Sequence, residues 1–373
     1  MNFILSTAII VTTLTSLFLV IRYRNVAIEG SVPVPLVTFL AILFTSGLDV
    51  GLIMFPLVDF QSFAADPEYA FANPLALEFG FWGFLVWGFY FLTTFYFCVV
   101  EPKLKLFEIP VIKLANNFCI IGTCAFTGYL FLHYLPDYIA GISDSLRFGG
   151  VALVVLLAVL SSTHLRFVKA LSLTSTALFF LLIAGAFLAS DIGFAGLGES
   201  LAGLGDYFGQ IHRFVLPLND YHAFYLFWWF AWSIMIGQFV SRFVGGLTAW
   251  QLLLALLVVP SIPIALWFAV LYGYFTQGLN VAGGLSWAMI AVGVLFVVNS
   301  LDSLTRLYTQ NVGLTVERLG IGRYVALNWF ILFALVLSFQ FTPFKIEWVG
   351  LLVIGIYAAV YALVYRHRAL LRA

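Results

Sequence analysis

Three tryptophans stand close together in the apolar segment 222–241: Trp228, Trp229 and Trp232. At 100° per residue, Trp228 and Trp232 share one face of a helix and Trp229 lies beside it. Tryptophan is enriched at membrane interfaces, so tryptophans deep in a span are expected to face protein or a cavity. Ring faces attract cations, quaternary ammonium groups above all. The cluster therefore predicts either a cation site or a packed aromatic interior.

A carboxylate in a second apolar segment is the next chemical feature. Asp49 lies between Gly47 and Gly51, shortly before Pro56. Glycine and proline loosen a transmembrane helix, and the freed carbonyls need partners such as a bound ion. An acidic residue inside a membrane usually marks the path of an ion, a proton or a solute. We expect Asp49 to pair with a cationic substrate or to carry a coupling proton. For the two glycines, close helix packing is the alternative.

A polar group also interrupts the apolar segment 283–306. It consists of Asn299, Ser300 and Asp302. Amide and hydroxyl oxygens suit a hard cation such as sodium, so Asn299 and Ser300 are candidate sodium ligands. Hydrogen bonding between helices is the alternative. The 5 histidines and 3 cysteines lack metal-site spacing, and we find no catalytic motif, so we do not expect an enzyme.

The composition defines the class of protein that carries these groups. Of 373 residues, 63% are hydrophobic and only 9% are charged, which indicates a polytopic membrane protein. A formal net charge of zero gives no support for nucleic-acid binding. Apolar runs predict about eleven transmembrane helices, at 3–21, 34–56, 78–100, 111–134, 147–163, 169–189, 222–241, 250–274, 283–306, 322–341 and 346–366.

The distribution of basic residues predicts the orientation. The first span is followed, not preceded, by Arg22 and Arg24, which favours an uncleaved anchor. All but three of the 17 basic residues fall on one side of the predicted membrane, the exceptions being Arg147, Arg213 and Lys345. The positive-inside rule then places the N-terminus outside and the C-terminus in the cytoplasm of a multi-pass inner-membrane protein, with lipid as its surroundings.

Two sets of five spans make equal halves, at 34–189 and 222–366. An odd number of spans in each gives the halves opposite orientations, as in inverted repeats whose substrate site lies at the membrane midplane. We expect the first helix of each half to be discontinuous. The remaining parts are a peripheral helix and loop at 1–33, an extracytoplasmic loop with an amphipathic helix at 190–221, and a short cytoplasmic tail at 367–373.

The tryptophan segment resembles the signature of the betaine/choline/carnitine transporter (BCCT) family, roughly F-Y-W-x-W-W-x-x-W-S-P-F-V-G-x-F-x-A-R-x-S-R-G-R-T. Ile234 replaces the proline, and Gly245 and Leu247 replace two arginines. The matching residues are Phe224, Tyr225, Trp228, Trp229, Trp232, Ser233, Gly237, Phe239, Arg242, Gly246 and Thr248. The third span also matches the family pattern W-x-x-x-x-W-x-x-Y, with Trp82, Trp87 and Tyr90.

The resemblance implies an all-α, LeuT-like core of five-plus-five helices with one extra N-terminal helix. It implies an aromatic box that holds the substrate, formed by Trp82, Trp87, Tyr90, Trp228, Trp229 and Trp232, and from its own chemistry we expect Asp49 to lie beside this box. It also implies ion coupling at Gly47, Leu48, Asp49, Phe296, Asn299 and Ser300. Asp49 departs from the family, which has glycine there, and Asn299 departs from a threonine.

We therefore expect a secondary transporter that imports a quaternary-ammonium solute. Choline comes first, then glycine betaine or carnitine, because Asp49 would repel the carboxylate of betaine. Sodium or a proton is the expected coupling ion, with no other cofactor, and the resemblance implies a homotrimer. The family usually has twelve spans, so this chain is expected to be a shortened member. Some members sense osmotic stress through long charged tails, which this sequence lacks, so we expect unregulated uptake. The alternatives are a transporter of another cationic amine and a non-transporting receptor or assembly protein on the same scaffold.

Overall fold

The computed structural model describes residues 1–373 apart from 49, 50, 280, 282 and 373. Within these residues, 10 helical segments are long and apolar enough to cross a membrane. They are α1 (Asn2–Tyr23), α5 to α7 (Pro74–Leu104), α8 (Pro110–Tyr138), α9 (Asp144–Ser161), α10 (Leu165–Ala189), α13 with its 3₁₀ end (Asp220–Phe243), α14 and α15 (Ala249–Thr276), α16 (Gly284–Val312), α18 (Ile321–Phe341) and α19 (Ile346–Arg366). The predicted all-α, multi-pass class is confirmed.

The second predicted span is interrupted, as expected for the first helix of a repeat. α2 (Leu36–Ser46) ends where the Gly47 N–H donates to the Leu43 carbonyl, and α3 (Gly51–Met54) follows as a separate turn. α4 (Pro56–Ala65) then begins at a proline, which has no N–H to donate and therefore suits the first helical position. The break lies within the Gly47–Pro56 stretch that the sequence identified.

Two further spans are broken at positions that the sequence did not predict. α5 (Pro74–Trp82) is followed by the 3₁₀ turn η2 (Phe84–Trp87), α6 (Gly88–Phe95), the π-helical turn η3 (Tyr96–Val100) and α7 (Glu101–Leu104). α14 (Ala249–Leu257) is separated from α15 (Ser261–Thr276) by a turn that contains Pro260. The two breaks meet, because the Phe84 N–H donates to the Ser261 hydroxyl at 2.8 Å.

The prediction of a discontinuous first helix in the second half is wrong. α13 (Asp220–Val240) runs without interruption, starting at the Asn219 side chain, which accepts from the His222 N–H. Ile234 stands where the family signature has its proline, so the helical hydrogen bonds continue. The span is 89% buried, against 17% for α1, so α13 is a central helix of the bundle.

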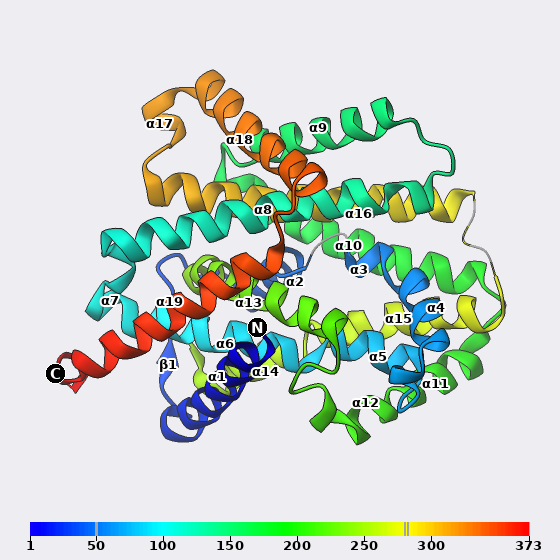
Figure 1. The fold of residues 1–373 in the computed structure, drawn as a ribbon, viewed down its shortest axis with the longest axis horizontal. Helices are drawn as coiled ribbons and strands as arrows, with labels where there is room; N and C mark the ends of the chain where they lie inside the picture. Colours follow the sequence, from blue (N-terminus) through cyan, green and yellow to red (C-terminus); the bar gives the residue numbers. More distant parts are fainter. Residues whose placement is uncertain (49–50, 280, 282, 373) are drawn as a thin grey trace.

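The other helices pack around α13 in a broad bundle. α6 and α19 contact α13 directly, while α8 lies beside α16, with α9 and α18 along one edge (Figure 1). Strands β1 (Ala27–Ile28) and β2 (Leu247–Thr248) pair antiparallel and join the loops after α1 and α13. The remaining short elements are η1 (Pro67–Tyr69), η4 (Leu106–Glu108), α11 (Gly193–Gly203), α12 (Gly205–Gly209), η5 (Ile211–Arg213), η6 (Ser241–Phe243), α17 (Val316–Leu319) and α20 (Arg368–Arg372). α11 and α12 provide the helix predicted within 190–221.

Candidate functional site

The interruption after α2 is held in place by side chains from two other spans. The Ser300 hydroxyl of α16 lies 2.7 Å from the Leu48 carbonyl and 3.4 Å from the Thr45 carbonyl. The Tyr90 hydroxyl of α6 donates to the Gly47 carbonyl at 3.3 Å. These contacts satisfy carbonyls that the broken helix leaves without helical partners. Asp49 lies outside the described residues, so its predicted role stays a prediction.

Gly47 is required by the close approach of an aromatic ring. A Cβ at this position would lie 3.0 Å from the Trp87 ring and 2.9 Å from the Leu43 carbonyl oxygen. Trp87 is fixed in turn, because its Nε1–H donates to the Trp82 carbonyl at 3.1 Å. The break in the second span and the break after α5 are therefore packed directly against each other.

The ring contacts join five of the six predicted box residues. The Trp82 ring stands at 85° to Trp228 and at 90° to Trp229, with centroid distances of 5.3 and 5.6 Å. Trp228 and Trp229 are nearly parallel, at 19° and 5.9 Å. Tyr90 links this group to Trp87, at 6.1 Å from Trp229 and 5.2 Å from Trp87. Two nearly parallel rings and a perpendicular third pack directly on one another, and we call this cluster of Trp82, Trp228 and Trp229 the aromatic corner.

The indole N–H groups divide into two kinds. Trp229 donates to the Phe81 carbonyl at 2.7 Å, which holds α13 against the end of α5. The Nε1 atoms of Trp82, Trp228 and Trp232 are buried without a hydrogen-bond partner. A buried donor that makes no hydrogen bond is costly. The Glu78 carboxyl lies close to the Trp82 indole, so the costly donors without a nearby acceptor are those of Trp228 and Trp232.

Of the two candidate sodium ligands, Ser300 contacts the interruption and Asn299 contacts a different helix. Ser300 donates to carbonyls of the broken span, as described above. The Asn299 side-chain amide lies 3.4 Å from the Ser172 hydroxyl of α10. Phe296 packs against Phe44 of α2, with ring centroids 5.9 Å apart. Ser300 therefore contacts the break and Asn299 contacts α10, and their role as sodium ligands stays a prediction.

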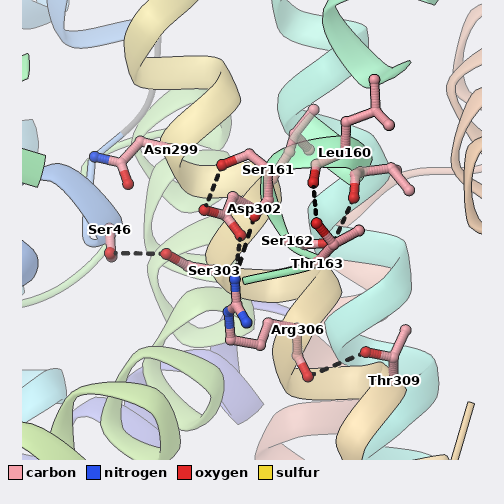
Figure 2. Close-up of polar contacts among 12 residues, drawn as sticks. Ser46, Leu160, Ser161, Ser162, Thr163, Asn299, Asp302, Ser303, Arg306 and Thr309 are labelled. Atoms are coloured by element: carbon pink, nitrogen blue, oxygen red, sulfur yellow. Dashed lines mark hydrogen bonds and ion pairs between the residues drawn. The ribbon is translucent and has the colours of Figure 1, made fainter. Parts of the chain in front are cut away.

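Asp302, the third member of that polar group, has a different partner. Arg306 lies one turn along α16, with its Nη2 atom 3.3 Å from Asp302 Oδ1, and neither side chain is more than 8% exposed. The Ser161 hydroxyl at the end of α9 donates to Asp302 at 2.9 Å, and the Ser303 hydroxyl is 3.1 Å from that of Ser46 in α2 (Figure 2). This buried network ties α16 to both α9 and α2.

A buried pair of acids was missed by the sequence analysis. Asp59 of α4 accepts from the Tyr221 and Tyr225 hydroxyls, at 2.9 and 3.0 Å for the shorter contacts. Glu78 of α5 is 0% exposed, and its carboxyl lies close enough to Asp59 and Trp82 to interact with both. The available signal was Glu78 itself, a lone acid within an apolar run and one helical turn before Trp82.

Comparison with known proteins supports the resemblance found in the sequence. Residues 114–284 match the family model described as "BCCT, betaine/carnitine/choline family transporter". Over this region the chain is similar to the BCCT transporters. An "Uncharacterized transporter" of Haemophilus influenzae is 27% identical over 299 residues, which is 66% of this chain and 44% of that protein. An "Ectoine/hydroxyectoine transporter" of Virgibacillus pantothenticus is 25% identical over 72% of this chain and 62% of its own length. The "High-affinity choline transport protein" of Escherichia coli is 28% identical over 40% of this chain and 24% of its own.

The matched regions thus span about half the length of the first two of these relatives, 44% and 62%. A solved structure of a Na⁺-coupled sialic acid symporter, in a substrate-bound outward-open state, superposes with a TM-score of 0.50. The superposition covers 96% of this chain and 82% of the symporter at 14% sequence identity. At this identity the similarity is one of fold, and it confirms the predicted LeuT-like class.

Proposed function

We propose that this protein is a secondary active transporter that imports a quaternary-ammonium solute by ion-coupled alternating access. The observation that carries the proposal is the corner formed by Trp82, Trp228 and Trp229, because it lies where a broken helix meets the central helix α13. LeuT-like transporters bind their substrates at such broken helices. The family match and the named functions of the relatives support the same reading.

Choline is the first candidate solute, followed by glycine betaine and carnitine. A trimethylammonium group has no N–H to donate, so it is recognised by ring faces and by nearby negative charge. Asp59 and Glu78 are acidic residues of α4 and α5, and Asp49 follows α2 in the sequence. They favour a solute without a carboxylate, and choline meets that condition.

Asp49 with Gly47, Leu48, Phe296, Asn299 and Ser300 remains our proposed ion-coupling region, with sodium or a proton as the ion. We further propose that the protein lies in the inner membrane with its N-terminus outside. A homotrimer, the family's assembly, is proposed on the resemblance alone.

The test is uptake of labelled choline, betaine and carnitine into proteoliposomes that contain the purified protein. A sodium gradient and a proton gradient are imposed separately. The proposal predicts accumulation of at least one solute under at least one gradient. The control variant Trp287→Ala should accumulate the solute as the unchanged protein does, because this tryptophan is 62% exposed on α16, outside the box. Saturable binding without uptake under either gradient would instead favour a receptor on this scaffold.

A further inference from the structure

Two buried acids, one on α4 and one on α5, lie close to each other, and the α5 acid is one turn before Trp82 of the aromatic corner. Asp59 is 3% exposed and Glu78 is 0% exposed. Each carboxyl lies within interaction range of the other. Asp59 comes from α4 and Glu78 from α5, and these two helices pack directly on each other. The pair is therefore fixed by the fold and not by flexible loops.

The donors around the pair are distributed unevenly. The Asp59 carboxylate accepts hydrogen bonds from the Tyr221 and Tyr225 hydroxyls. Both carboxylate oxygens of Glu78, by contrast, are buried without a hydrogen-bond partner at standard geometry. The groups nearest to Glu78 are the Asp59 carboxyl, which is an acceptor unless protonated, and the indole of Trp82, whose Nε1 is also without a partner. Two carboxyl groups in contact need a hydrogen between them, because a carboxylate can only accept.

No positive side chain balances these acids in the described part of the chain, where neither Asp59 nor Glu78 forms an ion pair. The titratable groups that interact with them are tyrosines, and Asp137 at the end of α8 interacts with two of these tyrosines, Tyr134 and Tyr138. The tyrosines are Tyr221 and Tyr225 of α13, Tyr134 and Tyr138 of α8, and Tyr69 of η1. α15, which packs on both α4 and α5, carries only tyrosines, Tyr272 and Tyr274, as titratable groups. Two carboxylates cannot both stay ionised in such surroundings.

A route for a proton leads to the pair from one side. A cleft of about 320 Å³ is lined by Tyr134 and Tyr221, together with His133, Lys345 and Glu347. Tyr221 therefore contacts both the cleft and Asp59, and a hydroxyl in that position can relay a proton between them. By the distribution of basic residues, this is the predicted extracytoplasmic side.

We propose that Asp59 and Glu78 form a shared proton site that couples solute import to the entry of one proton. This inference rests on the proposed transport function. One proton binds between the two carboxyls from the outer cleft, and the same proton leaves to the cytoplasm when the inward-facing state opens. The site lies one helical turn from Trp82 and one from Trp229, because Glu78 and Tyr225 each precede a box tryptophan by four residues. Occupancy of the box and protonation of the pair can therefore influence each other.

The test uses Glu78→Gln and Asp59→Asn in full-length protein in proteoliposomes, with Glu199→Gln, an exposed acid of α11, as the matched control. Two transport assays are run: choline counterflow with no ion gradient, and accumulation driven by an inward proton gradient of one pH unit. For one proton per solute, wild type and Glu199→Gln should reach up to about tenfold accumulation. The two site variants should still exchange choline but lose the gradient-driven accumulation. Accumulation by both variants at the wild-type level would overturn the proposal.

Infrared spectroscopy decides protonation without relying on transport. Wild type should show a protonated-carboxyl C=O band that disappears as the pH is raised, and Glu78→Gln and Asp59→Asn should each lose it while Glu199→Gln keeps it. Absence of the band in wild type would overturn the proton site. Suppose that the band is present but wild type neither exchanges nor accumulates any solute. The proposed transport function and its coupling to protons would then be wrong, whereas the shared proton site would stand. Melting temperatures of the purified variants identify a variant that fails to fold. The proton site is then judged from the other variant alone.

Discussion

Trp228 offers the sharpest test of the aromatic corner, because its ring can be changed without breaking a hydrogen bond. Its Nε1 has no partner, so Trp228→Phe keeps an aromatic face and removes no hydrogen bond. Trp228→Leu removes the face and keeps an apolar side chain. Each cation–π contact is worth about 0.5–2 kcal/mol, which corresponds to about 2- to 30-fold in affinity. We expect a loss in that range for Leu and a smaller loss for Phe.

Burial of an apolar group must be separated from attraction to a charge. Binding of choline is therefore compared with binding of its uncharged isostere, in which carbon replaces the nitrogen, by isothermal titration calorimetry. In wild type the cation should bind more tightly than the isostere, and Trp228→Leu should reduce that difference. Trp287→Leu, at the exposed position on α16, is the matched control. If Trp228→Leu weakened choline and the isostere equally, the ring would act only as an apolar surface, and the argument for a cation site would be refuted.

Two further predictions concern the elements that position the site. Asp302→Asn leaves the buried Arg306 without its counter-charge, so it should lower the free energy of unfolding by about 3–5 kcal/mol. The double variant Asp302→Asn with Arg306→Met should recover most of this loss, as measured by denaturant unfolding in detergent. No recovery in the double variant would contradict the pairing. Gly47→Ala should displace Trp87 and cost about 1–3 kcal/mol of stability together with a loss of choline affinity. Gly149→Ala, whose added Cβ meets nothing within 4 Å, is the control for thermal melting and binding, and equal effects of both alanines would contradict the close packing.

Local sequence patterns predicted what depends on spacing along one helix. Trp228 and Trp229 follow each other on one apolar segment, and their membership of a buried helix could be derived from helical periodicity and hydropathy. The break around Gly47 was also predictable, because glycine and proline leave carbonyls without helical partners. The sequence left two partners open for the Ser300 hydroxyl, an ion or another helix. In the structure this hydroxyl donates to the Leu48 carbonyl of the broken span.

The features that sequence reasoning missed depend on contacts between distant segments. Asp59 follows the second predicted span, which ends at residue 56, and its burial depends on Tyr221 and Tyr225, more than 160 residues later in the chain. The break after Trp82 depends on a partner in another span, Ser261, which accepts the freed N–H of Phe84. The mistaken break in α13 came from treating the two halves as equivalent, although only the first carries glycine and proline at the break.

The most direct measurement is a cryo-electron microscopy structure of the purified protein with saturating choline. We expect density for the trimethylammonium group against the faces of Trp228 and Trp229, with Trp82 as the perpendicular wall. Density for choline at another position, or an unchanged corner with no added density at saturating choline, would contradict the central claim.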